Sequence, residues 1–241
     1  MTRSKAMRVV TLPDPAALAE HAAAWLLDLA KAKDGAFRLC LSGGSTPKAL
    51  YQRLAAPPYR HGFPWARTEL FWGDERFVPP DDALSNYRMV KEALLDHAPI
   101  PKDNIYPVQT IGLDAEASAV AYQLTLEGAY AAETLASARP LFDVNLLGLG
   151  EDGHTASLFP DTTVLAERNR WVAPVIGAKA EARITLTYPA LESSAYAAFL
   201  VVGEGKRDML KRLIAGDAAL PSARLDPVGE LIVFCDEAAA A

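Results

Sequence analysis

The sequence of 241 residues has little cysteine and no concentrated positive charge. Its two cysteines, Cys40 and Cys235, both lie inside apolar runs, which predicts buried free thiols rather than a disulfide framework. Lysine and arginine number 24 against 30 aspartates and glutamates, which gives a formal net charge of -6, and no polybasic run occurs. Binding to nucleic acid or to an anionic membrane surface is therefore not expected.

Long hydrophobic runs are also missing. No segment approaches the roughly 20 continuous apolar residues of a membrane span, and the opening stretch MTRSKAMRVVTLPD lacks the apolar core of a secretory signal. These absences predict a cytoplasmic protein that does not enter a membrane. Hydrophobic residues nevertheless make up 51% of the chain, enough for one sizeable core. Because there is no internal repeat or low-complexity linker, we expect residues 1–241 to form a single domain.

Short, β-rich apolar runs alternate with segments of helical periodicity. The predicted strands are 37–42, 68–73, 143–148, 183–188, 196–202 and 231–235. The predicted helices are 15–33, 47–55, 86–97, 114–137 and 204–215. Several strands are continuously apolar, as expected when both of their faces are covered. The alternation predicts a three-layer, Rossmann-like α/β fold with a mostly parallel sheet and helices on both faces.

The stretch LSGGSTP at 41–47 leaves a predicted strand through two glycines and enters a helix. Thr46 is the expected N-cap and Pro47 the expected first helical residue. Flexible backbone, a helix N-terminus and clustered hydroxyls outline an anion site, most naturally for phosphate. A well-capped strand-to-helix turn without a ligand explains the stretch equally well, and no nucleotide-binding motif is present. The candidate binding residues here are Ser42, Gly43, Gly44, Ser45 and Thr46.

Charged residues directly follow another predicted strand, in WGDERFVPPDDALSNYR at 72–88. Parallel sheets gather functional groups at the carboxyl ends of their strands, and the Arg76 guanidinium is suited to grip a phosphate or carboxylate with two donors. The alternative is that Arg76 pairs with Asp74 or Glu75 and only fixes the loop. We favour a role in binding because three such loops are expected at one edge of the sheet. Ser85 is the expected N-cap of the next helix.

A third stretch, GLGEDGHTASLFP at 148–160, surrounds one histidine with glycines. An imidazole titrates near neutral pH, so His154 is a candidate proton acceptor from water, with Asp152 close enough to orient its ring. Thr155 is a candidate cap of a following short helix. A lone histidine lacks the ligand spacing of a zinc site, and the G-x-S-x-G signature of a serine nucleophile is absent. The remaining histidines are expected to be structural or solvated: His21, His61 and His97.

Together, SGGSTP, GDERFVPPDDALSNYRM and LLGLGEDGHTASLFP resemble, in this order, the motifs of the 6-phosphogluconolactonase family. RITLTYPAL at 183–191 and VVGEGKRDML at 201–210 extend the resemblance toward the C-terminus. The resemblance implies a fold like that of the aminosugar-phosphate isomerases. It also implies hydrolysis of a small-molecule partner, 6-phospho-D-glucono-1,5-lactone, to 6-phosphogluconate in the oxidative pentose phosphate pathway. No cofactor and no metal are expected.

The resemblance also implies roles for individual residues. His154 would be the general base with Asp152 beside it, and Arg76 would contact substrate and phosphate. A basic residue before the RITLT strand contacts phosphate in the family; Lys179 is the candidate, and Arg183 could share or take this role. Lys206, in VGEGK, also matches the family, without an assigned role.

Two other functions are compatible with the motifs. Aminosugar-phosphate deaminases and isomerases share the Asp-Gly-His core, but they carry a catalytic glutamate where this chain has Phe159. A non-catalytic sugar-phosphate sensor would need the anion site without the proton acceptor, whereas this chain retains His154. Both therefore rank behind the lactonase.

Overall fold

A computed structural model of the chain describes residues 7–241. Residues 1–6, which begin the stretch considered above for a signal sequence, lie outside the described residues. The described chain is built on a seven-stranded sheet in which every neighbouring pair of strands is parallel. In spatial order the strands are β1 (Met7–Leu12), β10 (Glu230–Asp236), β9 (Ser194–Val201), β6 (Phe142–Gly148), β2 (Phe37–Leu41), β3 (Thr68–Trp72) and β5 (Ile105–Tyr106).

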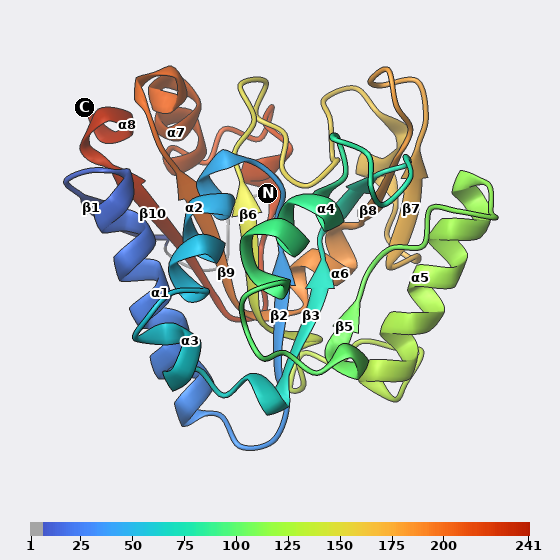
Figure 1. The fold of residues 1–241 in the computed structure, drawn as a ribbon. Helices are drawn as coiled ribbons and strands as arrows, with labels where there is room; N and C mark the ends of the chain where they lie inside the picture. Colours follow the sequence, from blue (N-terminus) through green and yellow to red (C-terminus); the bar gives the residue numbers. More distant parts are fainter. Residues whose placement is uncertain (1–6) are drawn as a thin grey trace.

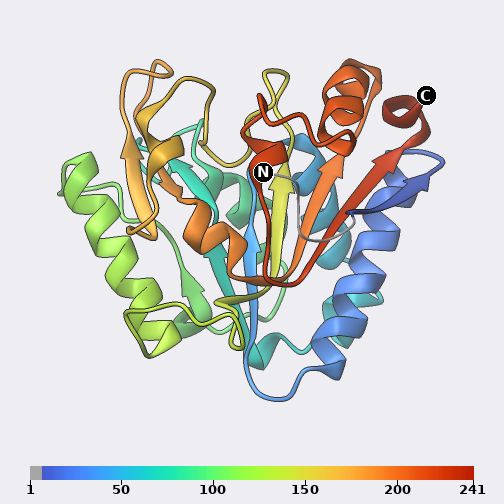
Figure 2. The ribbon, with the colours of Figure 1, turned by 180° about the vertical axis from the view of Figure 1, so that it is seen from behind.

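Helices cover both faces of this sheet, as the alternating sequence pattern predicts. The helices are α1 (Pro15–Ala32), α2 (Ser45–Leu54), α3 (Tyr59–Gly62), α4 (Asn86–Val90), α5 (Ala115–Tyr130), α6 (Tyr188–Glu192), α7 (Arg207–Ile214) and α8 (Glu237–Ala240). Figure 1 shows α2 and α4 in front of the sheet, and the view from behind in Figure 2 shows α6 on the opposite face. The predicted three-layer arrangement is confirmed. None of the helices within residues 7–241 is long and apolar enough to cross a membrane.

The order of the strands reverses between β2 and β6. The chain proceeds outward from β2 to β3 and β5, then returns to the other side of β2 and proceeds outward from β6 to β9 and β10. In open parallel sheets, ligands bind outside the carboxyl ends of the strands at such a switch point. These ends lie at the top of Figure 1, where the loops after β2 and β6 come together. Both loops carry the glycine-rich motifs noted in the sequence.

A second, three-stranded sheet lies beside this edge. It has the order β4 (Asp74–Arg76), β8 (Arg183–Leu186), β7 (Val172–Val175), and both pairings are antiparallel. The strand predicted at 183–188 therefore exists but belongs to this sheet, and it ends at Leu186 because α6 begins at Tyr188. The segment 74–76, expected to be a loop, is a strand. β7 directly precedes β8 in the chain, but no strand was predicted at 172–175. β4 lies far from β8 in sequence, so local patterns did not indicate this sheet.

Several predicted element ends differ from those in the structure. Helix α2 begins at Ser45 with Gly44 as its N-cap, so the prediction of Thr46 as the cap is wrong. The cause is Gly44 itself: its φ of 106° suits glycine and starts the helix two residues early. Ser85 does cap α4, since its Oγ accepts the Arg88 N–H at 3.2 Å. No helix follows Thr155 directly, and a tight turn joins it to Leu158.

Two predicted helices are shorter or less regular than expected. The helix predicted over 114–137 ends at Tyr130, because Ala131 takes a left-handed conformation. The helix predicted over 86–97 changes from α4 into a π-helical turn over Lys91–Leu95. The buried hydrophobic residues form one core cluster, as the composition predicts. Both cysteines are confirmed as buried free thiols.

Candidate active site

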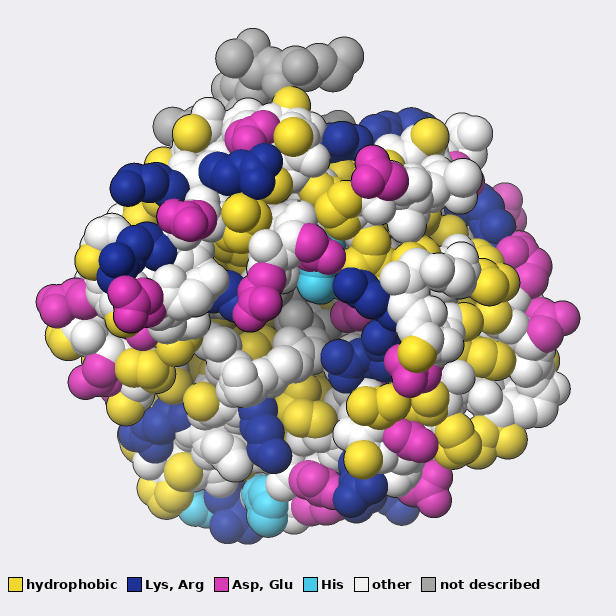
Figure 3. All heavy atoms as spheres, turned by 90° about the horizontal axis from the view of Figure 1, so that it is seen from above, with side chains coloured by type: hydrophobic (Ala, Val, Ile, Leu, Met, Phe, Trp, Pro, Cys, Tyr) yellow, Lys and Arg dark blue, Asp and Glu magenta, His cyan; other side chains and the backbone are white. Residues whose placement is uncertain are grey.

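A cavity of about 300 Å³ opens at the carboxyl edge of the large sheet, over the switch point between β2 and β6. Figure 3 looks down on this face and shows it hollowed near the middle, with a histidine beside acidic side chains and a group of basic side chains along the rim. The charged and polar side chains that line it are Ser42, Asp74, Arg76, Asn86, His154, Ser157, Lys179, Arg183 and Lys206. The predicted gathering of the three motif loops is therefore confirmed.

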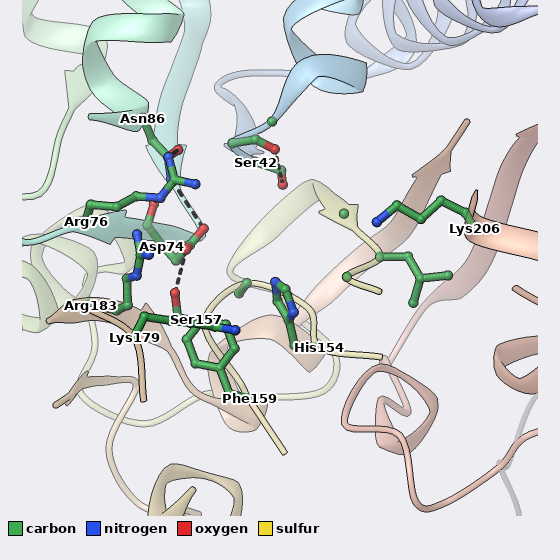
Figure 4. Close-up of a pocket in the computed structure, with 16 residues that line it drawn as sticks. Ser42, Asp74, Arg76, Asn86, His154, Ser157, Phe159, Lys179, Arg183 and Lys206 are labelled. Carbon is green, nitrogen blue, oxygen red and sulfur yellow. Dashed lines mark hydrogen bonds between the residues drawn. The ribbon is translucent and has the colours of Figure 1, made fainter. Parts of the chain in front are cut away.

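His154 points into this cavity (Figure 4). Asp152, which does not line the cavity, contacts its ring. Asp152 Oδ1 makes a short contact with His154 Nδ1 and accepts the His154 backbone N–H at 3.2 Å. Partial burial opposes ionisation of Asp152, but the hydrogen bond and charge of His154, with the charge of Lys179, outweigh it and lower the pKa of this carboxyl. Asp152 is therefore an anion that accepts from Nδ1–H, which leaves Nε2 as the basic nitrogen.

The backbone beneath the imidazole is bare because Gly150 lies there. A Cβ at this position would lie 2.0 Å from His154 Nδ1 and 2.8 Å from Asp152 Oδ1. The Gly150 N–H also donates to the His154 carbonyl at 2.9 Å, closing the loop on itself. The glycine pattern noted in the sequence thus serves the packing of the Asp152–His154 pair.

Phe159 and Lys179 form one wall of the cavity. The rings of Phe159 and His154 lie 4.7 Å apart between centroids. Lys179 Nζ lies 4.8 Å from the centroid of the Phe159 ring and 3.6 Å from Asp152 Oδ2. Phe159, where the resemblance implies a second acid in aminosugar deaminases, is therefore an apolar ring packed on the imidazole.

Beside Lys179, two arginines face each other across paired strands (Figure 4). Arg76 of β4 and Arg183 of β8 are direct cross-strand partners. Such like-charged pairs are unfavourable unless an anion lies between them. Burial, together with the charge of Arg76, lowers the pKa of Arg183. Its Nε and Nη1 are buried with no hydrogen-bond partner among residues 7–241, and Nη2 is 3.6 Å from Glu181.

Arg76 is held in place by Asn86, at the start of α4. Within the described chain the Arg76 guanidinium forms no ion pair; it donates to Asn86 Oδ1 at 3.0 Å and to the Leu84 carbonyl at 2.8 Å. The alternative in which Arg76 pairs with Asp74 or Glu75 is therefore wrong. A Cβ on Gly43 would lie 2.0 Å from Asn86 Oδ1, so this glycine lets the loop after β2 close onto α4.

Buried Glu75 fixes α4 in turn. Its carboxylate accepts the backbone N–H groups of Arg76, Asn86 and Tyr87, and Ser85 Oγ donates to it at 3.2 Å. Burial raises the pKa of Glu75, although these backbone hydrogen bonds oppose the rise. The helix N-terminus and three donors make this a favourable place for a buried carboxylate.

Most of the residues predicted from the sequence line the cavity: Ser42, Gly43, Gly44, Arg76, His154, Lys179 and Arg183. Ser45 and Thr46 do not, because α2 begins at Ser45 and places both in its first turn. Sequence reasoning missed Asp74, Asn86 and Ser157 as lining residues. Asp74 and Asn86 lie inside a quoted motif, but their place depends on the β4–β8 pairing, which has no local signal.

Within residues 7–241, no group of three or more histidine, cysteine or acidic side chains is arranged to hold a metal ion.

Comparison with known proteins yields consistent likenesses. A family model described as glucosamine-6-phosphate isomerases/6-phosphogluconolactonase matches residues 13–233. A 6-phosphogluconolactonase of a Nostoc species is 40% identical over 240 residues, with 97% of each chain covered. The structure of 6-phosphogluconolactonase from Trypanosoma cruzi has a TM-score of 0.86 at 29% identity, over 99% of this chain and 97% of that one. A monomeric glucosamine-6-phosphate deaminase, at 21% identity and a TM-score of 0.81 over 97% of this chain and 99% of that one, shares the fold.

Proposed function

Because the chain belongs to the glucosamine-6-phosphate isomerase/6-phosphogluconolactonase family, we propose that it hydrolyses 6-phospho-D-glucono-1,5-lactone to 6-phosphogluconate. This reaction is the second step of the oxidative pentose phosphate pathway. The observation that carries the proposal is one cavity that joins an Asp152–His154 pair to two facing arginines, Arg76 and Arg183. A proton acceptor and two paired guanidinium groups in one cavity are what a phosphorylated ester substrate requires.

The phosphate binds at the arginine wall in this proposal. Arg183 has two unpartnered donor atoms and a like-charged neighbour, so a phosphate there supplies hydrogen-bond acceptors and relieves the repulsion. Arg183 is therefore assigned the larger part of the role that the sequence left open between it and Lys179. Lys179 contacts Asp152 and the Phe159 ring. We assign Lys179 to closing the site over the bound substrate.

His154 acts as the general base. Its Nε2 removes a proton from water as the water oxygen attacks the lactone carbonyl, while Asp152 stabilises the imidazolium that forms. The tetrahedral intermediate then collapses, and protonated His154 returns the proton to the departing ring oxygen. General-base help of this kind is worth about 10²–10⁴-fold in rate, or about 3–5 kcal/mol. Binding of the phosphate group, which is remote from the reacting carbonyl, orients the lactone toward His154.

Replacement of the general base tests the proposal. In His154→Ala, we expect kcat on the lactone to fall about 10²–10⁴-fold once spontaneous hydrolysis is subtracted. The inhibition constant of inorganic phosphate should change little, because the arginines remain. His61→Ala, on an exposed histidine of α3 outside the cavity, is the matched control and should keep wild-type kcat. Equal turnover in His154→Ala and wild type would contradict the role of His154.

Two assays separate the alternatives. An aminosugar-phosphate deaminase would release ammonia from glucosamine 6-phosphate; we expect none, because Phe159 occupies the place of the second acid and packs on His154. A sugar-phosphate sensor would bind 6-phosphogluconate without accelerating lactone hydrolysis. Ammonia release, or binding without hydrolysis, would each overturn the lactonase assignment.

A further inference from the structure

Ser157 joins the loop of the proton acceptor to the strands of the arginine pair. It lies three residues after His154 and is almost fully buried at 1% exposure. Its Oγ donates to Asp74 Oδ2 at 2.6 Å, and its backbone N–H donates to Thr185 Oγ1 at 3.1 Å. Figure 4 shows the first of these bonds beside Arg183. We call these two hydrogen bonds the Ser157 link.

The two anchors of this link are themselves a cross-strand pair. Asp74 of β4 lies directly opposite Thr185 of β8, and two residues along lies the pair Arg76–Arg183. Residues two apart on a strand point to the same face, and a strand rises about 3.3 Å per residue. The arginine pair therefore lies about 7 Å from the anchors, on the same face of the small sheet.

Both ends of the link are held firmly. At one end, the Leu158 N–H donates to the Thr155 carbonyl at 2.9 Å, so the chain between His154 and Ser157 is closed into a tight turn. At the other end, Asn86 Nδ2 donates to the Asp74 carbonyl at 2.9 Å. Little freedom remains between the imidazole and the arginines. The Ser157 link is thus a fixed spacer between the two chemical ends of the cavity.

We infer that Ser157 is a positioning residue that sets this spacing and so places the lactone carbonyl at His154 when the phosphate is bound. The inference rests on the proposed function. A lactone without the phosphate is not held by the arginines, so its placement at His154 does not depend on the Ser157 link. In a well-ordered site, a misplacement of about 1 Å costs about 10²-fold in rate. The spacer must therefore be rigid for the bound phosphate to speed the reaction.

The test compares a phosphorylated and an unphosphorylated lactone in Ser157→Ala. Rates would be measured on 6-phospho-D-glucono-1,5-lactone and on D-glucono-1,5-lactone, with spontaneous hydrolysis subtracted. We expect the ratio of kcat/KM values, phosphorylated over unphosphorylated, to fall about tenfold, mainly through a lower kcat on the phosphorylated lactone. The inhibition constant of inorganic phosphate should stay within about twofold of wild type, because both arginines are untouched.

A matched control removes an equivalent hydrogen bond elsewhere. Ser193 is also buried, and its Oγ accepts the Leu141 N–H at 2.9 Å outside the cavity. Ser193→Ala should keep the wild-type ratio even where it lowers stability. A general loss of stability would change both variants alike, whereas loss of the spacer changes the ratio only in Ser157→Ala.

The outcomes are distinguishable. A folded Ser157→Ala with the wild-type ratio, or with weakened phosphate binding as its main defect, overturns the inference. Should Ser157→Ala fail to fold, Ser157→Cys keeps the side-chain volume but supplies only a weak donor, and the same lowered ratio is expected. Wild-type protein that accelerates hydrolysis of neither lactone would overturn the proposed function instead.

Discussion

At the scale of single residues, two glycines shape the site because they have no side chain. Gly150 leaves space for the Asp152–His154 pair, and Gly43 leaves space for the Asn86 amide. In both places a Cβ would lie 2.0 Å from the nearest polar atom, far inside van der Waals contact. Both positions require glycine because a neighbouring side chain occupies the place where a Cβ would lie. Neither glycine has a positive φ, so the backbone conformation is not the reason.

Gly150→Ala should therefore lower catalysis, although it replaces no catalytic side chain. The new Cβ forces the imidazole away from Asp152, and we expect kcat on the lactone to fall by about 10²-fold or more. The inhibition constant of inorganic phosphate should stay near the wild-type value. Steady-state kinetics with both ligands measures the two effects.

Gly128→Ala is the control for this substitution. Gly128 lies inside α5 with no atom within 4 Å of the new Cβ. Alanine there should leave kcat unchanged and raise stability by about 0.5–1 kcal/mol. Wild-type kcat in Gly150→Ala would show that the ring tolerates displacement and that its contact with Asp152 is dispensable.

How far the site could be predicted differs from residue to residue. His154 and Asp152 are two positions apart within one glycine-rich loop, so their neighbourhood follows from the sequence. Arg76 was predicted to bind phosphate or carboxylate. The hydrogen bond from Arg76 to Asn86 was not predicted, because in the sequence Asn86 looks like an ordinary residue of a first helical turn. Ser157 carries no signal at all: its partners are Asp74 and Thr185, which approach it only in the folded chain.

At the scale of elements, the small antiparallel sheet organises the arginine wall. The sequence predicts a strand near 183–188 from its apolar, β-branched residues, but it does not say which strand pairs with it. Pairing of β8 with β4 sets Arg183 directly opposite Arg76. A shift of register by one residue would turn every side chain of β8 to the other face and separate the two guanidinium groups. The anion site is thus a property of the strand pair.

Arg183→Met should change stability and binding in opposite directions. Arg183 carries a largely buried charge beside Arg76, and its Nε and Nη1 lack hydrogen-bond partners, so its removal should raise the free energy of unfolding without ligand by about 1–2 kcal/mol. Loss of charge-assisted hydrogen bonds to phosphate should raise the KM for the lactone about 10–100-fold. Thermal unfolding with and without inorganic phosphate, together with kinetics, tests both signs.

Arg212→Met serves as the comparison for the arginine variant. Arg212 pairs with Asp217 at 2.8 Å at the end of α7 and does not line the cavity. Its loss should leave KM unchanged and should not alter the rise in Tm that phosphate produces. An Arg183→Met protein that is less stable than wild type and still responds to phosphate would place the anion elsewhere.

At the scale of the whole molecule, the end of α6 ties the outer layer to the active-site loop. Glu192 Oε1 accepts the Asp226 N–H at 3.1 Å, and the Glu192 carbonyl accepts the Val228 N–H at 2.9 Å. The segment just before Asp226 reaches the loop of His154, where the Ser222 N–H donates to the Gly153 carbonyl at 3.1 Å. Burial raises the pKa of Glu192 to about 7, against the opposing charge of Arg168.

This raised pKa predicts that Glu192 makes the fold less stable as the pH rises. The folded state holds the proton to about pH 7, whereas the unfolded chain releases it near 4.5, so stability is lost between these values. After allowance for partial exposure, the loss is about 1–2 kcal/mol. Glu192→Gln keeps the acceptor and removes the charge, so urea unfolding should find it equal to wild type near pH 4.5 and more stable at pH 8. A difference between the two proteins that stays constant across this range would show that Glu192 ionises alike in both states, and would remove it as a source of pH dependence.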